Sequence, residues 1–269
     1  NHAKRDARTD LTGKRALLTG GRAKIGMYIA LRLLRDGAHT TITTRFPRDA
    51  VRRFRQMPDS ADWLHRLKVV GIDLRDPAQV IALADEVSAA GPLDILINNA
   101  GFGVYSGFEE SDIADERRLH ELLSWVPLRL SHAAVPGMLE RKRGWILNVA
   151  SVAAFTPTGT YGAATSAAAS LSRSLNARYR RRGVRVTALC PGLLATEFHE
   201  RMGEDHLPEL PPLAWASTER VAREGLRALA RGRSVLISDW RYRLASPLTR
   251  ILPDRVLERM STTGDSTAG

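Results

Sequence analysis

The sequence has almost no cysteine and no long apolar run. Cys190 is the only cysteine among 269 residues. An intramolecular disulfide is therefore impossible, and a reducing, cytoplasmic compartment is expected. Cys190 lies in the apolar stretch VTALCPG, which predicts a buried and inert thiol. No segment approaches the roughly 18 uncharged apolar residues of a transmembrane helix.

Lysine is also scarce, although the chain is strongly basic. Only five of the 40 basic residues are lysines, none of them after Lys142, and the formal net charge is +11. The arginines are spread over the whole chain, and no aromatic-interleaved stripe or zinc-finger spacing accompanies them. We interpret them as solvated helix faces, with specific nucleic-acid binding as the weaker alternative. No histidine has metal-ligand spacing with a partner, so no metal site is expected.

The composition divides the chain into three parts. Residues 1–10 carry charge without an apolar core, which is unlike a secretory signal, and we expect a disordered leader. Residues 11–239 form one expected domain without an interdomain linker. Residues 240–269 alternate arginine with apolar residues. We interpret this tail as a segment that packs on the body or on another subunit, with contact to an anionic membrane surface as the alternative.

Short apolar runs alternate with helical patterns along the predicted domain. This order predicts an α/β fold, a doubly wound, Rossmann-like parallel sheet of about seven strands with helices on both faces. Strands are expected at 15–19, 39–43, 67–72, 93–97, 145–149, 184–189 and 235–238. Helices are expected at 25–36, 47–57, 77–90, 115–140 (with a kink at Pro127), 163–179 and 218–230.

A glycine-rich turn joins the first predicted strand to the first predicted helix, in the stretch TGGRAKIG. Glycines allow the backbone to approach a pyrophosphate, and the helix N-terminus offers free N–H groups and a positive dipole end. The turn therefore predicts a dinucleotide site, with a tight turn that binds no ligand as the alternative.

The end of the second predicted strand favours NADP(H) over NAD. Rossmann-type proteins that prefer NAD commonly have a carboxylate there, which binds the ribose 2′-hydroxyl. This chain has Thr44-Arg45 instead, with Arg22 and Lys24 in the neighbouring turn. These three cations could surround a 2′-phosphate, and arginine can bind it bidentately. The alternative is that Arg45 is an ordinary surface arginine.

Several motifs, in this order along the chain, resemble those of short-chain dehydrogenases/reductases. They are Thr19-Gly20 with Ile25-Gly26, Asp73-Leu74, Asn98-Asn99-Ala100-Gly101, Asn148-Val149-Ala150-Ser151, Tyr161, and Pro191-Gly192 with Thr196. The resemblance covers residues 11–238 and implies a nicotinamide cofactor, a small carbonyl or alcohol substrate, and a homodimer or homotetramer. The oligomer contact is expected on the small-residue face of the helix at 163–179.

The resemblance also implies a role for each matching residue. Cofactor contacts are expected at the pyrophosphate (Gly20, Ile25, Gly26), the adenine (Asp73, Leu74), the ribose and sheet edge (Asn99, Ala100, Gly101, Tyr161) and the nicotinamide (Pro191, Gly192, Thr196). Ser151 matches the serine that polarises the carbonyl, and Tyr161 matches the general acid/base. A phenol beside a hydroxyl can supply the proton that an alkoxide needs after hydride transfer.

The chain departs from the family pattern at four places. Thr165 replaces the lysine four residues after the tyrosine, Leu123 replaces a helix asparagine, with Ser124 next to it, and Lys24 replaces the middle glycine of the turn. The segment 151–161 is also shorter than usual. The missing lysine would have lowered the tyrosine pKa.

The expected function is an NADP(H)-dependent oxidoreductase that interconverts a carbonyl and an alcohol. The segment 197–216 is expected to cover the substrate, and its apolar residues suit a small to medium apolar compound. The departures leave an alternative open: a non-redox relative, either a cofactor-binding scaffold or regulator, or a cyclase or isomerase that uses the same pocket.

Overall fold

Strands and helices alternate along the chain in the computed structural model, which describes residues 9–22, 24–89, 91–103, 108–192 and 217–238. The strands are β1 (Arg15–Thr19), β2 (His39–Thr44), β3 (Leu67–Gly71), β4 (Ile95–Asn98), β5 (Gly144–Val149), β6 (Val184–Cys190) and β7 (Val235–Ile237). The longer helices are α1 (Lys24–Arg35), α2 (Pro47–Arg55), α4 (Pro77–Ala89), α5 (Ile113–His120), α6 (Val126–Glu140), α7 (Gly159–Tyr179) and α9 (Thr218–Ala230).

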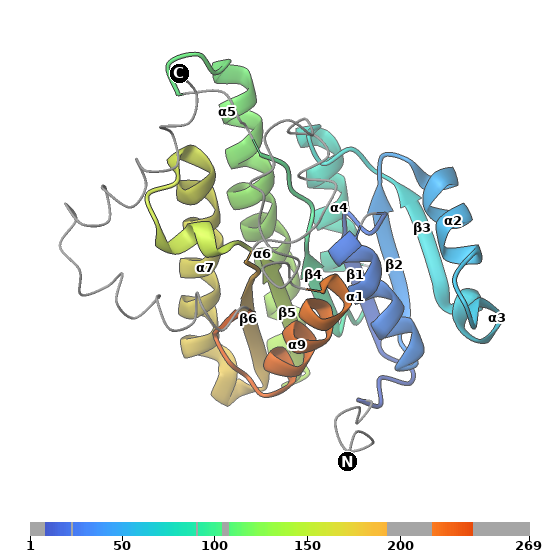
Figure 1. The fold of residues 1–269 in the computed structure, drawn as a ribbon. Helices are drawn as coiled ribbons and strands as arrows, with labels where there is room; N and C mark the ends of the chain where they lie inside the picture. The colour runs from blue at the N-terminus through green and yellow to red at the C-terminus, as the bar shows by residue number, and fades with distance from the viewer. Residues whose placement is uncertain (1–8, 23, 90, 104–107, 193–216, 239–269) are drawn as a thin grey trace.

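All seven strands form one parallel sheet in the order β3-β2-β1-β4-β5-β6-β7. The predicted doubly wound parallel sheet is therefore confirmed. The strand order changes direction between β1 and β4, in the middle of the sheet (Figure 1). In sheets of this kind, ligands bind in the crevice beyond the carboxyl ends of the strands at such a switch point.

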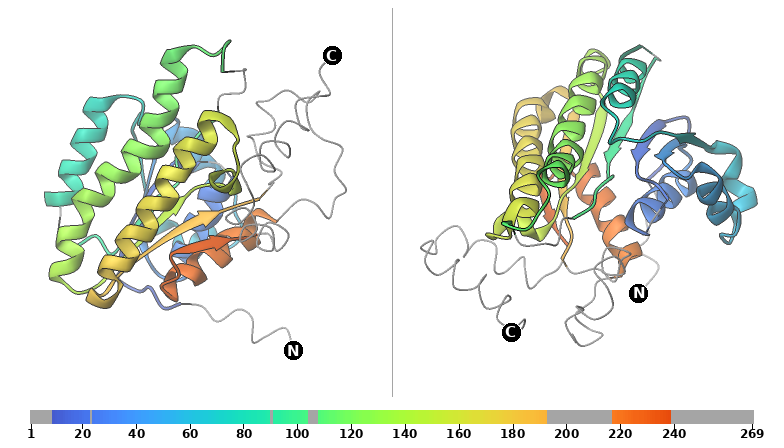
Figure 2. Two further views of the ribbon diagram at one scale, coloured as in Figure 1. Left: turned by 90° about the vertical axis from the view of Figure 1, so that its left-hand side faces the viewer. Right: turned by 90° about the horizontal axis from the view of Figure 1, so that it is seen from above.

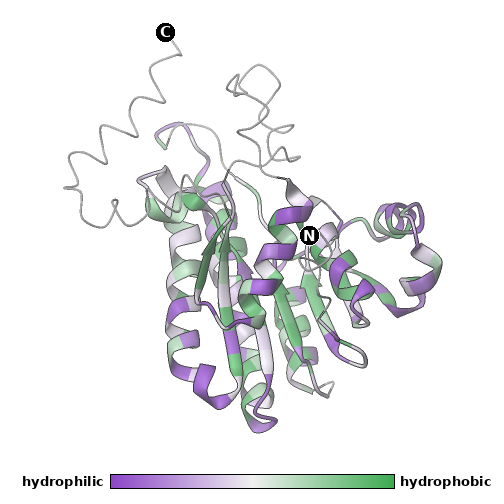
Figure 3. Cartoon of the chain, turned by 60° about the horizontal axis from the view of Figure 1, so that its bottom comes forward, coloured by the Kyte–Doolittle hydropathy of each residue, from purple (hydrophilic) through white to green (hydrophobic). Residues whose placement is uncertain are grey.

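Helices cover both faces of the sheet. Figure 2 shows α4, α6 and α7 on one side of it, and α1 with α9 on the other. The central strands are mostly apolar; β4, for example, is buried throughout, as expected of a strand covered on both faces. Hydrophobic residues accordingly concentrate on the strands and hydrophilic ones on the outer surfaces of the helices (Figure 3). The two largest apolar clusters lie on opposite faces of the sheet.

The helix expected at 115–140 is interrupted. It consists of α5 and α6, joined by a π-helical turn at Glu121–Trp125. The interruption therefore lies ahead of Pro127, which occupies the first turn of α6, where proline is tolerated. Four short helical segments were not predicted: α3 (Ser60–Trp63), η2 (Leu64–Arg66), η4 (Val152–Phe155) and η5 (Arg180–Arg182).

The terminal segments of the prediction lie outside the described residues. These are 1–8, within the expected leader, and the whole expected tail at 240–269. Among the helices that are described, none is long and apolar enough to cross a membrane.

Candidate active site

Hydrogen bonds join the carboxyl ends of β1 and β4 to each other. The Thr19 hydroxyl accepts the backbone N–H groups of Asn99 and Ala100 at 3.0 and 3.1 Å. The Asn99 side-chain amide donates to the carbonyl oxygens of Thr19 and Gly20 at 3.0 and 2.9 Å. Asn99, the first residue beyond β4, thus satisfies the hydrogen-bonding capacity of the carbonyl groups at the end of β1. In this way the motif Asn98-Asn99-Ala100-Gly101 holds the glycine-rich turn in place.

Two glycines of the turn are required by the close packing at this point. Gly20 has a positive φ of 71°, and a Cβ added there would lie 2.8 Å from Ala100 Cα. A Cβ at Gly26 would lie 2.4 Å from Asn99 Nδ2 and 2.7 Å from the Gly20 carbonyl oxygen. Neither position has room for a side chain.

The first turn of α1 is suited to an anion. It follows the glycine turn directly and contains no acidic residue. Its unsatisfied N–H groups and positive dipole end favour a phosphate. Ile25, partly buried, packs on the core below, while nothing is described of the Lys24 side chain. This end of α1 therefore fits the pyrophosphate of a dinucleotide.

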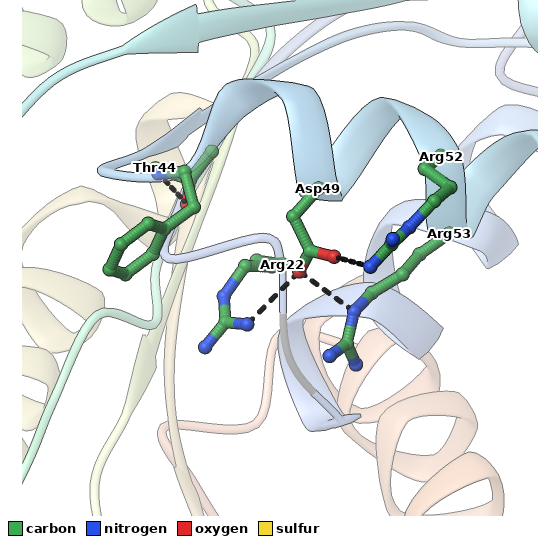
Figure 4. Close-up of polar contacts among 6 residues, drawn as sticks. Arg22, Thr44, Asp49, Arg52 and Arg53 are labelled. Atoms are coloured by element: carbon green, nitrogen blue, oxygen red, sulfur yellow. Dashed lines mark hydrogen bonds and ion pairs between the residues drawn. The ribbon is translucent and has the colours of Figure 1, made fainter.

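Two of the cations expected around a 2′-phosphate come together beyond β2. The guanidinium carbons of Arg22 and Arg45 lie 5.0 and 5.3 Å from the centroid of the Phe46 ring. Arg22 Nη1 also donates to Asp49 Oδ2 of α2 at 3.1 Å, and Arg52 and Arg53 bind the same carboxylate (Figure 4). Hydrogen bonds from these arginines, with Arg22 first, hold the pKa of Asp49 below its usual value.

Asp73 and Leu74 lie beside this basic group, just beyond β3. The Ile72 N–H donates to the Thr44 carbonyl oxygen at 3.1 Å, which keeps the ends of β2 and β3 together. Arg75 Nη2 donates to Asp73 Oδ2 at 2.6 Å, and this bond is the main reason why the pKa of Asp73 is lowered. Arg45 lowers it further through its charge. Leu74 is buried.

Ser151 and Tyr161 meet beyond β5. Ser151 caps η4 by accepting the Ala153 N–H at 3.2 Å, and Tyr161 lies in the first turn of α7. The Ser151 side chain lies close enough to the Tyr161 phenol to lower its pKa. Desolvation raises the pKa of the Tyr161 phenol, the Ser151 side chain offsets part of this rise, and the nearby Cys190 adds to it. The phenol is therefore neutral at physiological pH and available as a proton donor.

Thr165 lies one helical turn after Tyr161 and is 1% exposed. Its hydroxyl donates to the carbonyl oxygens of Tyr161 and Gly162 at 2.9 and 3.2 Å. The position at which the sequence resemblance implies a lysine is thus filled by a neutral group that is bonded to the backbone of its own helix.

Leu123 and Ser124 lie in the π-helical turn, against α7. Leu123 belongs to a small apolar cluster with Ala164 that also touches Tyr161. The Ser124 hydroxyl donates to the Ala164 carbonyl oxygen at 3.2 Å. Packing against Leu123 also leaves no room at Gly101, where a Cβ would lie 2.9 Å from Leu123 Cδ2.

Pro191 and Gly192 lie next to the Ser151 segment. The Pro191 carbonyl oxygen accepts the Val152 N–H at 3.0 Å, so the start of the loop after β6 runs beside η4. Cys190, which ends β6, is fully buried, and burial raises the pKa of its thiol to about 12, in keeping with an inert thiol. Thr196 and the expected substrate cover at 197–216 lie outside the described residues.

Three features of the site were not predicted from the sequence. One is the pair Phe46 and Asp49, since an aromatic residue and an acid at a helix start carry no spacing signal. The second is the π-helical turn itself. The third is a buried polar chain under the site, in which Asn98 donates to Asn148 at 2.7 Å and Asn148 donates to Ser172 at 2.8 Å. Both asparagines belong to motifs of the sequence, but no spacing in the chain indicates that they bond to each other.

The parallel sheet has a glycine turn at its switch point, and the Ser151–Tyr161 pair lies beyond the neighbouring strand β5. Together with the strand order, these features define a Rossmann-like dinucleotide-binding protein. The family model described as short chain dehydrogenase matches residues 14–207. The chain belongs to the short-chain dehydrogenase family.

Individual relatives agree with this assignment. The chain is 35% identical over 234 residues to oxidoreductase UcpA of Escherichia coli O157:H7, covering 82% of this chain and 83% of that protein. It is 35% identical over 192 residues to 2-keto-3-deoxy-L-fuconate dehydrogenase of Xanthomonas campestris, covering 70% of this chain and 61% of the other. Its structure resembles a short-chain dehydrogenase from Sphingobium yanoikuyae in complex with NADPH, with a TM-score of 0.75, 27% identity, and coverage of 83% and 87%.

Proposed function

We propose that this protein is an NADP(H)-dependent oxidoreductase that interconverts a carbonyl and an alcohol on a small to medium apolar substrate. The observation that carries the proposal is that Ser151, at the start of η4, and Tyr161, in the first turn of α7, come together at the carboxyl edge of the sheet. The relatives named as dehydrogenases and oxidoreductases support it.

The catalytic roles follow from the chemistry of the two hydroxyl groups. The bound nicotinamide would supply or accept the hydride. Ser151 would hydrogen-bond the substrate oxygen and orient it. Tyr161 would donate its proton to that oxygen during reduction and remove the proton during oxidation. Because the pKa of Tyr161 is raised, donation is the easier of the two directions at neutral pH.

The cofactor site would extend along the carboxyl edge of the sheet. Its proposed members are Gly20, Arg22, Lys24, Ile25, Gly26, Arg45, Asp73, Leu74, Asn99, Ala100, Gly101, Tyr161, Pro191, Gly192 and Thr196. The choice of NADP(H) rests on Arg22 and Arg45, which lie over one ring beyond β2. The NADPH bound by the Sphingobium relative supports it.

A second function is favoured by Thr165. Thr165 supplies no positive charge to lower the pKa of Tyr161, and burial raises it. A non-redox role would tolerate this, either as a cofactor-binding scaffold or regulator or as a cyclase or isomerase. Of the relatives, one that is 37% identical over 147 residues is named inactive 2-(S)-hydroxypropyl-CoM dehydrogenase 2, from Xanthobacter autotrophicus.

We propose that the protein is cytoplasmic. We also propose that it forms a homodimer or homotetramer in which the subunits contact one another through α7. Its partner would be a small-molecule substrate and not a specific nucleic acid. We favour packing of 240–269 on the body or on another subunit over contact with a membrane surface.

Titration of the protein with NADPH and with NADH at fixed ionic strength, followed by cofactor fluorescence, tests the proposal. We expect NADPH to bind at least tenfold more tightly, because only its 2′-phosphate meets the two arginines. The variant Arg45→Gln should reduce this preference, whereas Arg117→Gln, an exposed change on α5, should leave it unchanged. Binding of neither nucleotide would overturn the proposed function.

A further inference from the structure

Phe46 is a half-exposed aromatic residue in a strongly charged surrounding. Its exposed fraction is 49%, and it follows β2 directly, at the position before the first helical residue of α2. Core packing therefore does not explain a phenylalanine here. The contacts of the ring that stand out are the guanidinium groups of Arg22 and Arg45, at 5.0 and 5.3 Å from its centroid.

The main chain fixes the place of the ring. The Phe46 N–H donates to the Thr44 hydroxyl at 3.2 Å, and Phe46, with φ −124° and ψ 67°, lies outside the helical region that the next residue, Pro47, disfavours. Thr44 is itself buried at the end of β2. The ring is thus held by the sheet, whereas the two arginine side chains that meet it come from different segments of the chain.

The ring and one carboxylate together determine where these cations lie. Two guanidinium groups repel each other, and an aromatic face placed against both of them offsets part of this repulsion. Arg22 is additionally bound by Asp49, at 3.1 Å from Nη1 to Oδ2 (Figure 4). The side chains of Arg22 and Asp49 are only 20% and 23% exposed, so this ion pair is less screened than one on the open surface.

We propose that Phe46 is a specificity-determining positioning residue, which holds Arg22 and Arg45 where both can bind the 2′-phosphate of NADP(H). This inference rests on the proposed cofactor preference and adds the residue that makes the two arginines act together. Preorganised arginines lose less side-chain freedom when a phosphate binds, so the ring favours the phosphorylated nucleotide without touching it. A nucleotide without the 2′-phosphate gains nothing from this arrangement.

Three variants test the role of the ring: Phe46→Leu, which removes the aromatic face, Phe46→Tyr, which keeps it, and Phe108→Leu as a matched control. Phe108 is also an exposed phenylalanine, but it lies between β4 and α5. Each protein is titrated with NADPH and with NADH, and its melting temperature is recorded. We expect Phe46→Leu to weaken NADPH binding by about five- to tenfold and to leave NADH binding unchanged. Phe46→Tyr and Phe108→Leu should behave like the wild type.

The outcomes separate the inference from the proposed function. Equal weakening of NADPH and NADH by Phe46→Leu would mean that the ring contacts the adenine, and would overturn the positioning role. The positioning role would also be overturned if Phe46→Leu bound NADPH as tightly as the wild type. The same holds if Phe46→Tyr lost as much NADPH affinity as Phe46→Leu. Wild-type protein that binds neither nucleotide overturns the proposed function and this inference with it.

Discussion

A lysine at position 165 should increase the rate of alcohol oxidation at neutral pH. Positions 161 and 165 are one helical turn apart on the same face of α7, where side chains of neighbouring turns lie about 5–6 Å apart. An ammonium group about 5 Å from the phenolate of Tyr161 would stabilise it by ~3 kcal/mol at an effective dielectric constant of about 20. That energy corresponds to roughly a hundredfold in rate.

Packing opposes part of this gain. Thr165 is 1% exposed, and a lysine stem must find room where a small branched side chain now lies. Overpacking of this kind typically costs ~1–3 kcal/mol of stability. The variant should therefore have a lower melting temperature than the wild type and a higher turnover, because the electrostatic gain acts on the reaction and the packing cost acts on folding.

The assay measures NADP⁺ reduction with a panel of small apolar secondary alcohols at neutral pH. Thr165→Met is the matched control, since methionine is also long and unbranched but carries no charge. The reasoning predicts a gain with lysine and none with methionine. A Thr165→Lys protein that is folded, binds NADPH and turns over no faster than Thr165→Met would refute it. That result would favour the non-redox alternative.

The remaining predictions concern proton transfer and the glycine turn. Because the pKa of Tyr161 is raised, the phenolate needed for alcohol oxidation is scarce at neutral pH, so the oxidation rate should rise about tenfold per pH unit through alkaline pH. The reduction rate, which uses the neutral phenol, should stay flat over this range; a plateau of the oxidation rate below about pH 9 would contradict the assignment. Gly26→Ala should lower the free energy of unfolding by ~1–3 kcal/mol in urea denaturation, because its Cβ would lie 2.4 Å from Asn99 Nδ2. The control Gly71→Ala, whose Cβ would lie 3.5 Å from Pro47 Cγ, should cost much less, and equal losses in the two variants would count against the packing argument.

Local patterns in the sequence were sufficient for the fold because a parallel sheet covered on both faces requires continuous apolar strands. The strand Arg15–Thr19 and the helix Thr218–Ala230 have the predicted bounds, and most other elements differ by one or two residues at an end. The larger differences are at α7, which begins four residues earlier than predicted, and at the interrupted α5–α6 segment. A π-helical turn depends on how Leu123 and Ser124 pack against α7, and no local pattern in the chain encodes that contact.

The sequence by itself determined the class of the sheet, the position of the glycine turn between the first strand and the first helix, and the absence of a lysine at position 165. These depend on the order of residues and on local periodicity, which are complete in the chain. Only the tertiary structure decided that Tyr161 lies beside Ser151, that Asn99 ties β4 to the turn, and that Phe46 and Asp49 hold Arg22 beyond β2. Each of these contacts joins segments that are separate in the sequence, and its distance is set by how the helices and strands pack together.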